Sequence, residues 1–222
     1  FENYEKPKNY EHLDKVQKLL YKIKYRDLNI NSENSKSLFY KTHMRERAQK
    51  LLKGPTHIDY NLFGTVTGRL ATNIGSFPVL TMMRELRKLV RPHNDWLISL
   101  DYNGAEARTF LGLAGKPQPQ EDIHEWNKGG IIRKKDISRD EMKTIFFTWL
   151  YSPDDSEILK NNVYDKKAVL DKYYIDGRVK TPFKRSIIVE ERKALNYLVQ
   201  STTADLVLDK AVEIDKFLQD KK

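Results

Sequence analysis

The chain has 222 residues, enough for one large domain or two small domains with a real hydrophobic core. It carries 40 Lys and Arg against 31 Asp and Glu, and the resulting net charge of +9 favours a polyanionic partner such as nucleic acid or nucleotides. The lack of cysteine excludes disulfides and cysteine-based metal sites. No apolar run reaches the roughly 18 residues of a membrane span, and no signal-peptide core is present. We therefore expect no membrane partner and an intracellular protein.

The first third of the chain predicts two basic helices. Residues 10–26 place apolar side chains at amphipathic spacing, and a second helical pattern over residues 39–54 should end at Gly54 and Pro55. Extended structure and turns are expected over residues 56–70. The chain opens on Phe1, which indicates that it begins inside a longer protein or that its start was processed.

Residues 96–102, "WLISLDY", predict a buried strand that ends at an acid. Four of the five residues before Asp101 are apolar. A carboxylate at the end of a buried strand is costly unless it is exposed, paired or bound to metal. Asp101 is therefore a candidate metal ligand, although a solvated strand end would have the same pattern.

The segment "RDEMKTIFFTWLYS" places Arg139, Lys143, Phe147 and Tyr151 at four-residue intervals. On an α-helix these four side chains, called the ladder below, form one slowly drifting row about 18 Å long. Ser138 is a candidate N-cap for this helix, and Glu141 three residues later would complete a capping box. Two interpretations stay open: the edge of a core helix with a solvated basic first turn, or a contact surface for an anion, because cations at a helix N-terminus oppose the macrodipole.

The last part of the chain predicts further helices and one hairpin. A short helix is expected over residues 166–174, a turn at Asp176 and Gly177, a basic hairpin over 179–189, and a helix from Glu190 to the end. The pattern has no regular alternation of strand and helix. Helices grouped around a few short strands predict an α+β fold.

Five stretches occur in an informative order: "TVTGRLAT" at 65–72, "LISLDYNGAEARTF" at 97–110, "DIH" at 122–124, the ladder, and "RKALNYLVQSTTAD" at 192–205. Together they resemble the family A, DNA polymerase I-like, DNA polymerases over residues 56–210. The resemblance implies a right-hand polymerase fold with an antiparallel palm sheet, helical fingers and a thumb remnant. It also implies template-directed nucleotidyl transfer from a dNTP to a primer 3′-OH, assisted by two Mg²⁺ ions. A protein of this kind is expected in the cytoplasm of a bacterial or phage-infected cell.

The resemblance divides the chain into four parts. These are a thumb-like helical segment at 1–55, a palm with the first catalytic strand at 56–120, fingers at 121–178 that include the nucleotide-binding helix 138–151, and a basic hairpin and palm helix at 179–222.

The same resemblance assigns roles to single residues. Asp101 would be the first metal-binding carboxylate, and Tyr102 would offer its backbone carbonyl to the metal. Arg139 and Lys143 would meet the triphosphate, with Lys143 also assisting departure of pyrophosphate. His124 would be a further phosphate contact, although a lone His in a sequence is usually structural.

Three further roles concern the sugar and the bases. Phe147 would pack against the nucleotide sugar and base, Tyr151 would lie near the templating base, and Glu106 would crowd a ribose 2′-OH. Glu106 could equally be a helix-surface acid that pairs with Arg108. The residues expected at the minor groove of primer and template are Arg69, Arg192, Asn196 and Gln200.

The sequence departs from the family at its second catalytic carboxylate. No His-Asp dipeptide occurs, and the chain ends 22 residues after Gln200, so the remaining palm hairpin would come from outside this sequence or from another chain. Thr148 and Ser152 replace the glycines of the fingers helix, and "NGA" replaces "SxI". Two alternatives stay open: a catalytically inactive polymerase-fold module that binds DNA, and a single-subunit RNA polymerase, against which Glu106 and Gln200 argue.

Overall fold

The computed structural model describes residues 5–33, 36–132, 136–152 and 163–221. The chain divides into two compact units, and the division falls inside helix α1 (Tyr10–Lys24) and helix α7 (Glu191–Gln219). The first unit is formed by Phe1–His12 with Asp101–Ala211, and the second by Leu13–Leu100 with Val212–Lys222. The four-part division by resemblance stays a prediction.

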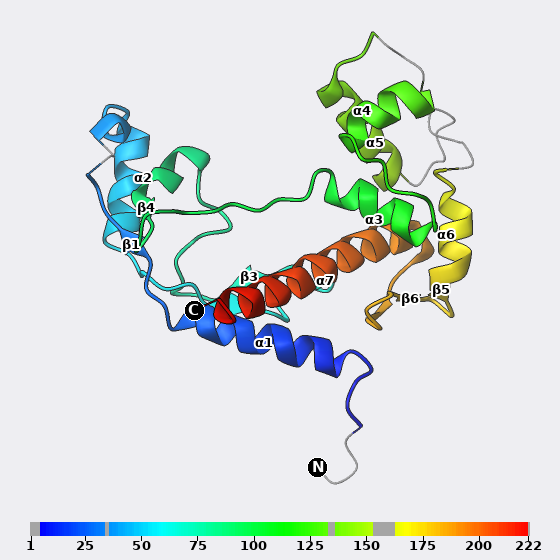
Figure 1. Ribbon diagram of the computed structural model, residues 1–222, viewed down its shortest axis with the longest axis horizontal. Helices are drawn as coiled ribbons and strands as arrows, with labels where there is room; N and C mark the ends of the chain where they lie inside the picture. Colours follow the sequence, from blue (N-terminus) through cyan, green and yellow to red (C-terminus); the bar gives the residue numbers. More distant parts are fainter. Residues whose placement is uncertain (1–4, 34–35, 133–135, 153–162, 222) are drawn as a thin grey trace. The chain divides into compact units, whose positions relative to one another are not determined.

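The first unit gathers short helices around the N-terminal part of α7 (Figure 1). The predicted helices are confirmed here, including the capping box that Ser138 and Glu141 form at the start of α5. The elements are α3 (Ala105–Leu113), α4 (Ile123–Trp126), a π-helical segment (Asn127–Ile132), α5 (Arg139–Tyr151), α6 (Lys166–Tyr173), β5 (Tyr174–Ile175), β6 (Arg178–Lys180) and β7 (Ser186–Ile188).

The three strands of the first unit form one antiparallel sheet in the order β5-β6-β7. Val179 faces Ile187 across the β6–β7 pair, and both are buried. The β5–β6 turn is made by Asp176 and Gly177, both with positive φ, of 54° and 69°. A two-residue turn with two positive φ values matches the twist of a hairpin, so the predicted turn is confirmed. The hairpin predicted over residues 179–189 is confirmed by the β6–β7 pair.

Aromatic side chains form the centre of the first unit's core. Phe110 of α3 lies 5.4 Å from Trp149 and 5.5 Å from Tyr164, measured between ring centroids, and Phe146 lies 5.4 Å from Tyr164. The buried Tyr164 hydroxyl donates a 2.6 Å hydrogen bond to Asn127 Oδ1. These contacts bury one face of α5, so its other face is left for the ladder.

A buried carboxylate ties three segments of the first unit together. Asp205 of α7 has no exposed surface, and its carboxylate accepts hydrogen bonds from Arg185 Nε at 3.0 Å and Nη2 at 2.7 Å and from His12 Nε2 at 3.3 Å. Burial acts to raise the pKa of Asp205, but the hydrogen bonds from His12 and Arg185 outweigh it and hold the pKa below its ordinary value of 3.8. The first turn of α1 and the β6–β7 turn are therefore fixed to α7.

Replacement of Asp205 by Asn should be strongly destabilising. Because Arg185 would keep a nearly buried charge without its partner, we expect the free energy of unfolding to fall by about 3 to 5 kcal/mol at neutral pH. The depressed pKa means that the carboxylate stabilises the fold above the unfolded-state pKa of about 3.9 and loses this contribution as the pH falls below it. The difference between wild type and D205N in urea unfolding should shrink from pH 6 to pH 3.

Asp209→Asn is the matched control for this prediction. Asp209 is 40% exposed and lies 3.9 Å from His12 Nδ1. An exposed pair of this kind contributes about 1 kcal/mol or less. Equal losses for the two variants, or a D205N deficit that does not change with pH, would contradict the assignment of stability to the buried cluster.

The second unit has its own core. It is built by α2 (Thr42–Leu52) and two 3-10 helices, Lys36–Phe39 and Arg84–Leu89, around Phe77, which has no exposed surface. Two antiparallel strand pairs complete it: β1 (Asn29–Ile30) with β4 (Val90–Arg91), and β2 (Tyr60–Asn61) with β3 (Ala71–Thr72). The two basic helices predicted for this region are confirmed. Within the described ranges, no helix is long and apolar enough to cross a membrane.

The buried strand predicted over residues 96–102 is wrong. The segment is not paired with any strand of the described chain, and Trp96 is 80% and Ile98 82% exposed. An apolar run becomes a buried strand only where neighbouring strands satisfy its backbone and other elements cover its faces. The described residues supply neither, so Asp101 lies in an exposed, extended connection.

The glycine of "NGA" is required by packing. Gly104 precedes α3 in the left-handed region, with φ 60° and ψ 49°. A Cβ atom at this position would lie 2.2 Å from Cγ2 of Ile123, the first residue of α4. The absence of a side chain at Gly104 therefore lets α4 approach the start of α3 closely.

Gly104→Ala should lower the free energy of unfolding by about 2 to 5 kcal/mol. The left-handed backbone costs a non-glycine residue about 1 to 2 kcal/mol, and the clash with Ile123 adds about 1 to 3 kcal/mol. Gly115→Ala is the control, since Gly115 has φ 66° but no atom within 4 Å of its Cβ position. Equal losses for the two variants in chemical denaturation would show that packing against Ile123 does not matter.

Candidate functional site

Helix α5 presents the ladder along a face that the core covers only in part, at Phe147. Met142, Phe146, Trp149 and Leu150 are buried on the opposite face. Lys143 is exposed and forms no ion pair with a described residue, Phe147 is half-buried, and Tyr151 is 37% exposed. Phe147 packs against the core, as expected for the edge of a core helix, while Lys143 and Tyr151 stay exposed, so both interpretations of the ladder keep support and an accessible surface remains.

Aromatic rings pack together at the C-terminal half of the ladder. The rings of Phe147 and Tyr151 are stacked with centroids 5.9 Å apart, and His124 lies 6.1 Å from Phe147. The Tyr151 hydroxyl donates a hydrogen bond to the carboxylate of Glu106 on α3. This bond joins α5 to the helix that follows Asp101, so the ladder and the sequence block at 97–110 are in direct contact.

Glu106 does not pair with Arg108. The Arg108 guanidinium instead donates to three backbone carbonyls, of Asn103 at 2.8 Å and of Pro119 and Glu121 at 2.7 Å. Arg108 therefore braces the Asn103 segment against the loop before α4, while Glu106 is directed to Tyr151.

The N-terminal half of the ladder is tied to an acid. Arg139 donates from Nε at 3.0 Å and from Nη2 at 2.7 Å to Oδ2 of Asp122. Asp122 is also the N-cap of α4, where its Oδ1 accepts from the backbone N–H groups of His124 and Glu125. The first cation of the ladder is thus held in place by α4.

His124 is buried, with 1% of its surface exposed. Burial lowers the pKa of its imidazole, so the ring is neutral near pH 7. Its Nδ1 has no hydrogen-bond partner in the described part of the chain. In this arrangement a phosphate has little access to the ring, and a contact with His124 would need α4 or α5 to move.

Asp101 and Tyr102 lie exposed at the start of the first unit. Together they offer a carboxylate and a backbone carbonyl, which are oxygen ligands of the type Mg²⁺ prefers. No group of three or more His, Asp or Glu side chains that could hold a metal ion occurs among the described residues. Asp205 does not supply the missing ligand, because Arg185 and His12 occupy its carboxylate. The described residues therefore do not complete a metal site.

The predicted DNA-contacting residues of α7 lie on one face. Gln200 donates a hydrogen bond to Asn196 Oδ1, and Arg192 is 67% exposed with its Nε 2.7 Å from Glu190. A cavity of about 750 Å³ lies between the end of α5, α6 and the start of α7, and its lining includes Tyr151, Arg192 and Asn196. The ladder and the α7 face thus border the same cavity.

The backbone at Thr148 and at Ser152 does not require glycine. Ser152 follows α5 with φ −71° and ψ 135°, an extended conformation open to any residue, and its N–H donates to Thr148 O at 2.9 Å. The helix ends without a left-handed residue, so glycine would bring no conformational advantage here.

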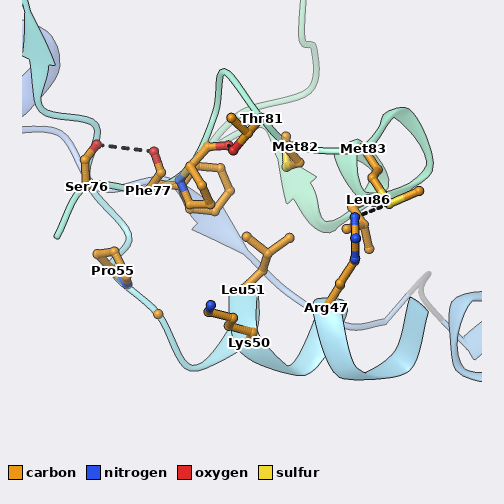
Figure 2. A pocket seen from close by; sticks show the side chains of 12 residues that line it. Arg47, Lys50, Leu51, Pro55, Ser76, Phe77, Thr81, Met82, Met83 and Leu86 are labelled. Carbon is orange, nitrogen blue, oxygen red and sulfur yellow. Dashed lines mark hydrogen bonds between the residues drawn. The ribbon is translucent and has the colours of Figure 1, made fainter. Parts of the chain in front are cut away.

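Arg69 belongs to the second unit, where it is exposed. That unit has its own cavity of about 520 Å³, shown in Figure 2, with Arg47 and Lys50 of α2 beside an apolar wall that includes Phe77 and Leu86. None of the candidate site residues predicted from the sequence lines it.

Sequence reasoning missed Asp122 and Asn103. The missed signal for Asp122 was the pattern Asp-x-x-Glu at 122–125, which is typical of a helix N-terminus. Asn103 carries no comparable sequence signal, because its role depends on the turn at Gly104 that brings it to α4.

The comparisons with known proteins show a similarity of fold alone. No protein-family profile and no curated protein matches the sequence. The structure is similar to that of the polymerase domain of Pol1 from M. smegmatis in complex with DNA primer-template and dNTP, with a TM-score of 0.56 and 15% identity. The match covers 96% of this chain and 56% of that chain. The chain therefore has a DNA polymerase-like fold of helices and small antiparallel sheets, and it spans about half of the solved domain.

The hydrogen bond between Glu106 and Tyr151 should be measurable as a coupling energy. We expect Glu106→Ala and Tyr151→Phe to be non-additive by about 0.5 to 1.5 kcal/mol in a double-mutant cycle of unfolding free energies, because each variant alone removes the same bond. Additive effects would show that the two side chains do not interact in solution.

Proposed function

We propose that the chain is the nucleotide- and DNA-binding part of a family A DNA polymerase. In this proposal the right-hand fold contributes palm, fingers and a thumb remnant, and the reaction is template-directed transfer of a nucleotide from a dNTP to a primer 3′-OH. The DNA polymerase-like fold supports it, as does the order of the five sequence blocks. Primer-template DNA and dNTPs are the partners of the similar Pol1 domain.

One observation carries the proposal. The Tyr151–Glu106 hydrogen bond brings the ladder of α5 against the helix that begins four residues after Asp101. A polymerase must hold a nucleotide between a cationic phosphate contact and the site of metal-assisted chemistry. The first unit contains both groups of residues, and the rings of Phe147 and Tyr151 lie beside Glu106.

The residues of the ladder then have separate tasks. Arg139 and Lys143 would bind the triphosphate, where two cations balance charge that develops on the leaving pyrophosphate. Phe147 would pack on the sugar and base. Glu106, held by Tyr151, would crowd a 2′-OH, so its role as a filter against ribonucleotides depends on that hydrogen bond.

The two Mg²⁺ ions remain part of the proposal. Asp101 and the Tyr102 carbonyl would hold one ion, which would supply charge stabilisation for phosphoryl transfer. The second carboxylate would come from polypeptide outside residues 1–222, either a further segment or another chain. The exposed apolar run before Asp101 supports this arrangement, because a run of that composition is suited to pairing with an added strand.

A catalytically inactive module that binds primer-template DNA is the second candidate. The incomplete set of metal ligands among the described residues favours it. Both candidates bind DNA through the basic chain and the face of α7. They differ in whether nucleotide is incorporated by the complete protein.

Asp101→Ala in the complete protein should reduce primer extension at least about 100-fold, because a metal-binding carboxylate contributes several kcal/mol of charge stabilisation. Binding of primer-template duplex should change little. Asp95→Ala is the matched control, since Asp95 is also exposed and its replacement alters the net charge equally. Extension is measured on a labelled primer with all four dNTPs and Mg²⁺.

Three outcomes separate the candidates. Loss of extension in D101A with normal extension in D95A supports the polymerase. Normal extension by D101A rejects the role of Asp101. Salt-sensitive DNA binding by the wild-type protein without any extension supports the inactive module instead.

A further inference from the structure

Asp122 is the most heavily hydrogen-bonded carboxylate that borders the ladder, yet none of the roles above uses it. Its Oδ1 accepts from the backbone N–H of His124 at 2.9 Å and of Glu125 at 3.2 Å. Its Oδ2 accepts from Arg139 and from the side-chain amide of Asn103. One oxygen therefore caps α4, while the other orients α5 and the segment after Asp101.

The cap fixes where the Arg139 guanidinium can lie. The side chain of Asp122 is 22% exposed and that of Arg139 is 42% exposed. Nε and Nη2 each direct one N–H to the same oxygen of Asp122, which fixes the plane of the guanidinium; the second N–H of Nη2 and the two of Nη1 remain, and Nη1 lies 3.4 Å from the exposed Asp140. An anion that approaches Arg139 meets a guanidinium whose orientation is already set.

Asn103 extends the network to the candidate catalytic segment. Its side chain donates to Asp122 Oδ2 and accepts from the Ile123 N–H at 3.1 Å, and its backbone carbonyl accepts from Arg108 Nε at 2.8 Å. Asn103 follows Asp101 by two residues. The position of the Asp101 segment and the direction of Arg139 are thus set by one carboxylate.

The electrostatics keep Asp122 charged. The hydrogen bond from Arg139 is the largest influence that lowers the pKa of Asp122, and Asn103 and the backbone groups of α4 add to it. Asp122 therefore stays ionised throughout the neutral range. A fixed negative charge beside Arg139 would by itself weaken the binding of an anion, so its benefit must lie in orientation.

We propose that Asp122 is a positioning residue for the nucleotide: it holds Arg139 in the orientation that binds the triphosphate and aligns it, through Asn103, with the Asp101 segment. The inference rests on the proposed function. The effect of neutralising Asp122 on nucleotide binding separates two opposite expectations. If Asp122 positions Arg139, its neutralisation weakens nucleotide binding; if Asp122 merely competes with phosphate for Arg139, its neutralisation strengthens it.

The test measures the affinity of the complete protein for dCTP with Mg²⁺, on a primer-template with a dideoxy-terminated primer and a templating dG. Asp122→Asn keeps a side-chain oxygen that can cap α4 but removes the charge-assisted bond to Arg139. We expect the Kd for dCTP to rise about tenfold, the scale of one lost preorganised charge-assisted contact.

Two further variants separate positioning from a general effect on folding. In an Arg139→Gln background, Asp122→Asn should raise the Kd by no more than about twofold, because the residue through which it acts is absent. Asp165→Asn is the matched control: Asp165 caps α6 through the N–H of Ala168 at 2.9 Å, and it has no arginine partner within the described residues. That variant should leave the Kd unchanged.

The inference is overturned by a Kd that is unchanged or lowered in D122N, or by an equal rise in the Arg139→Gln background, which would show that Asp122 acts through the α4 cap. Failure of the proposed function is recognised separately. In that case the wild-type protein binds primer-template without measurable affinity for dCTP, and the inference falls with it.

Discussion

The Asp122 carboxylate is the constraint on which the candidate site depends. Both of its oxygens accept hydrogen bonds, and the donors come from the start of α4, from Arg139 of α5 and from Asn103. One short side chain thereby holds together three segments that are separated in sequence. The consequence is that the first cation of the ladder has a fixed orientation, whereas Lys143, one turn later, is exposed and has no ion pair within the described part of the chain.

A second, buried charge organises the support behind the site. Asp205 lies in the middle of α7, the helix that also carries Asn196 and Gln200, and it can remain ionised only because Arg185 and His12 surround it. This arrangement fixes the hairpin and the start of α1 to the helix that would face DNA. The cluster is therefore structural, and it leaves Asp205 unable to act as a metal ligand.

The sequence was a good guide wherever a pattern depended only on local periodicity. The long helices, the hairpin turn and the capping box at Ser138 follow from spacing and turn chemistry, and the structure confirms them. The ladder was accessible to the same reasoning, but its acidic partner was not, because Asp122 lies 17 residues from Arg139 and in a helix of a single turn. The strand over residues 96–102 failed for the opposite reason: composition can show that a segment is suited to a sheet, but only the rest of the fold can provide the sheet.

The exposed run from Trp96 to Leu100 also has a consequence for how this polypeptide behaves in solution. Large apolar side chains project from an extended backbone whose N–H and C=O groups are not part of any described sheet. Such a segment is a template for edge-to-edge pairing between copies. The net charge of +9 works against close approach, but that repulsion is screened as salt rises. Colloidal stability of the isolated chain therefore depends on ionic strength, with self-association favoured in high salt until another strand covers the run.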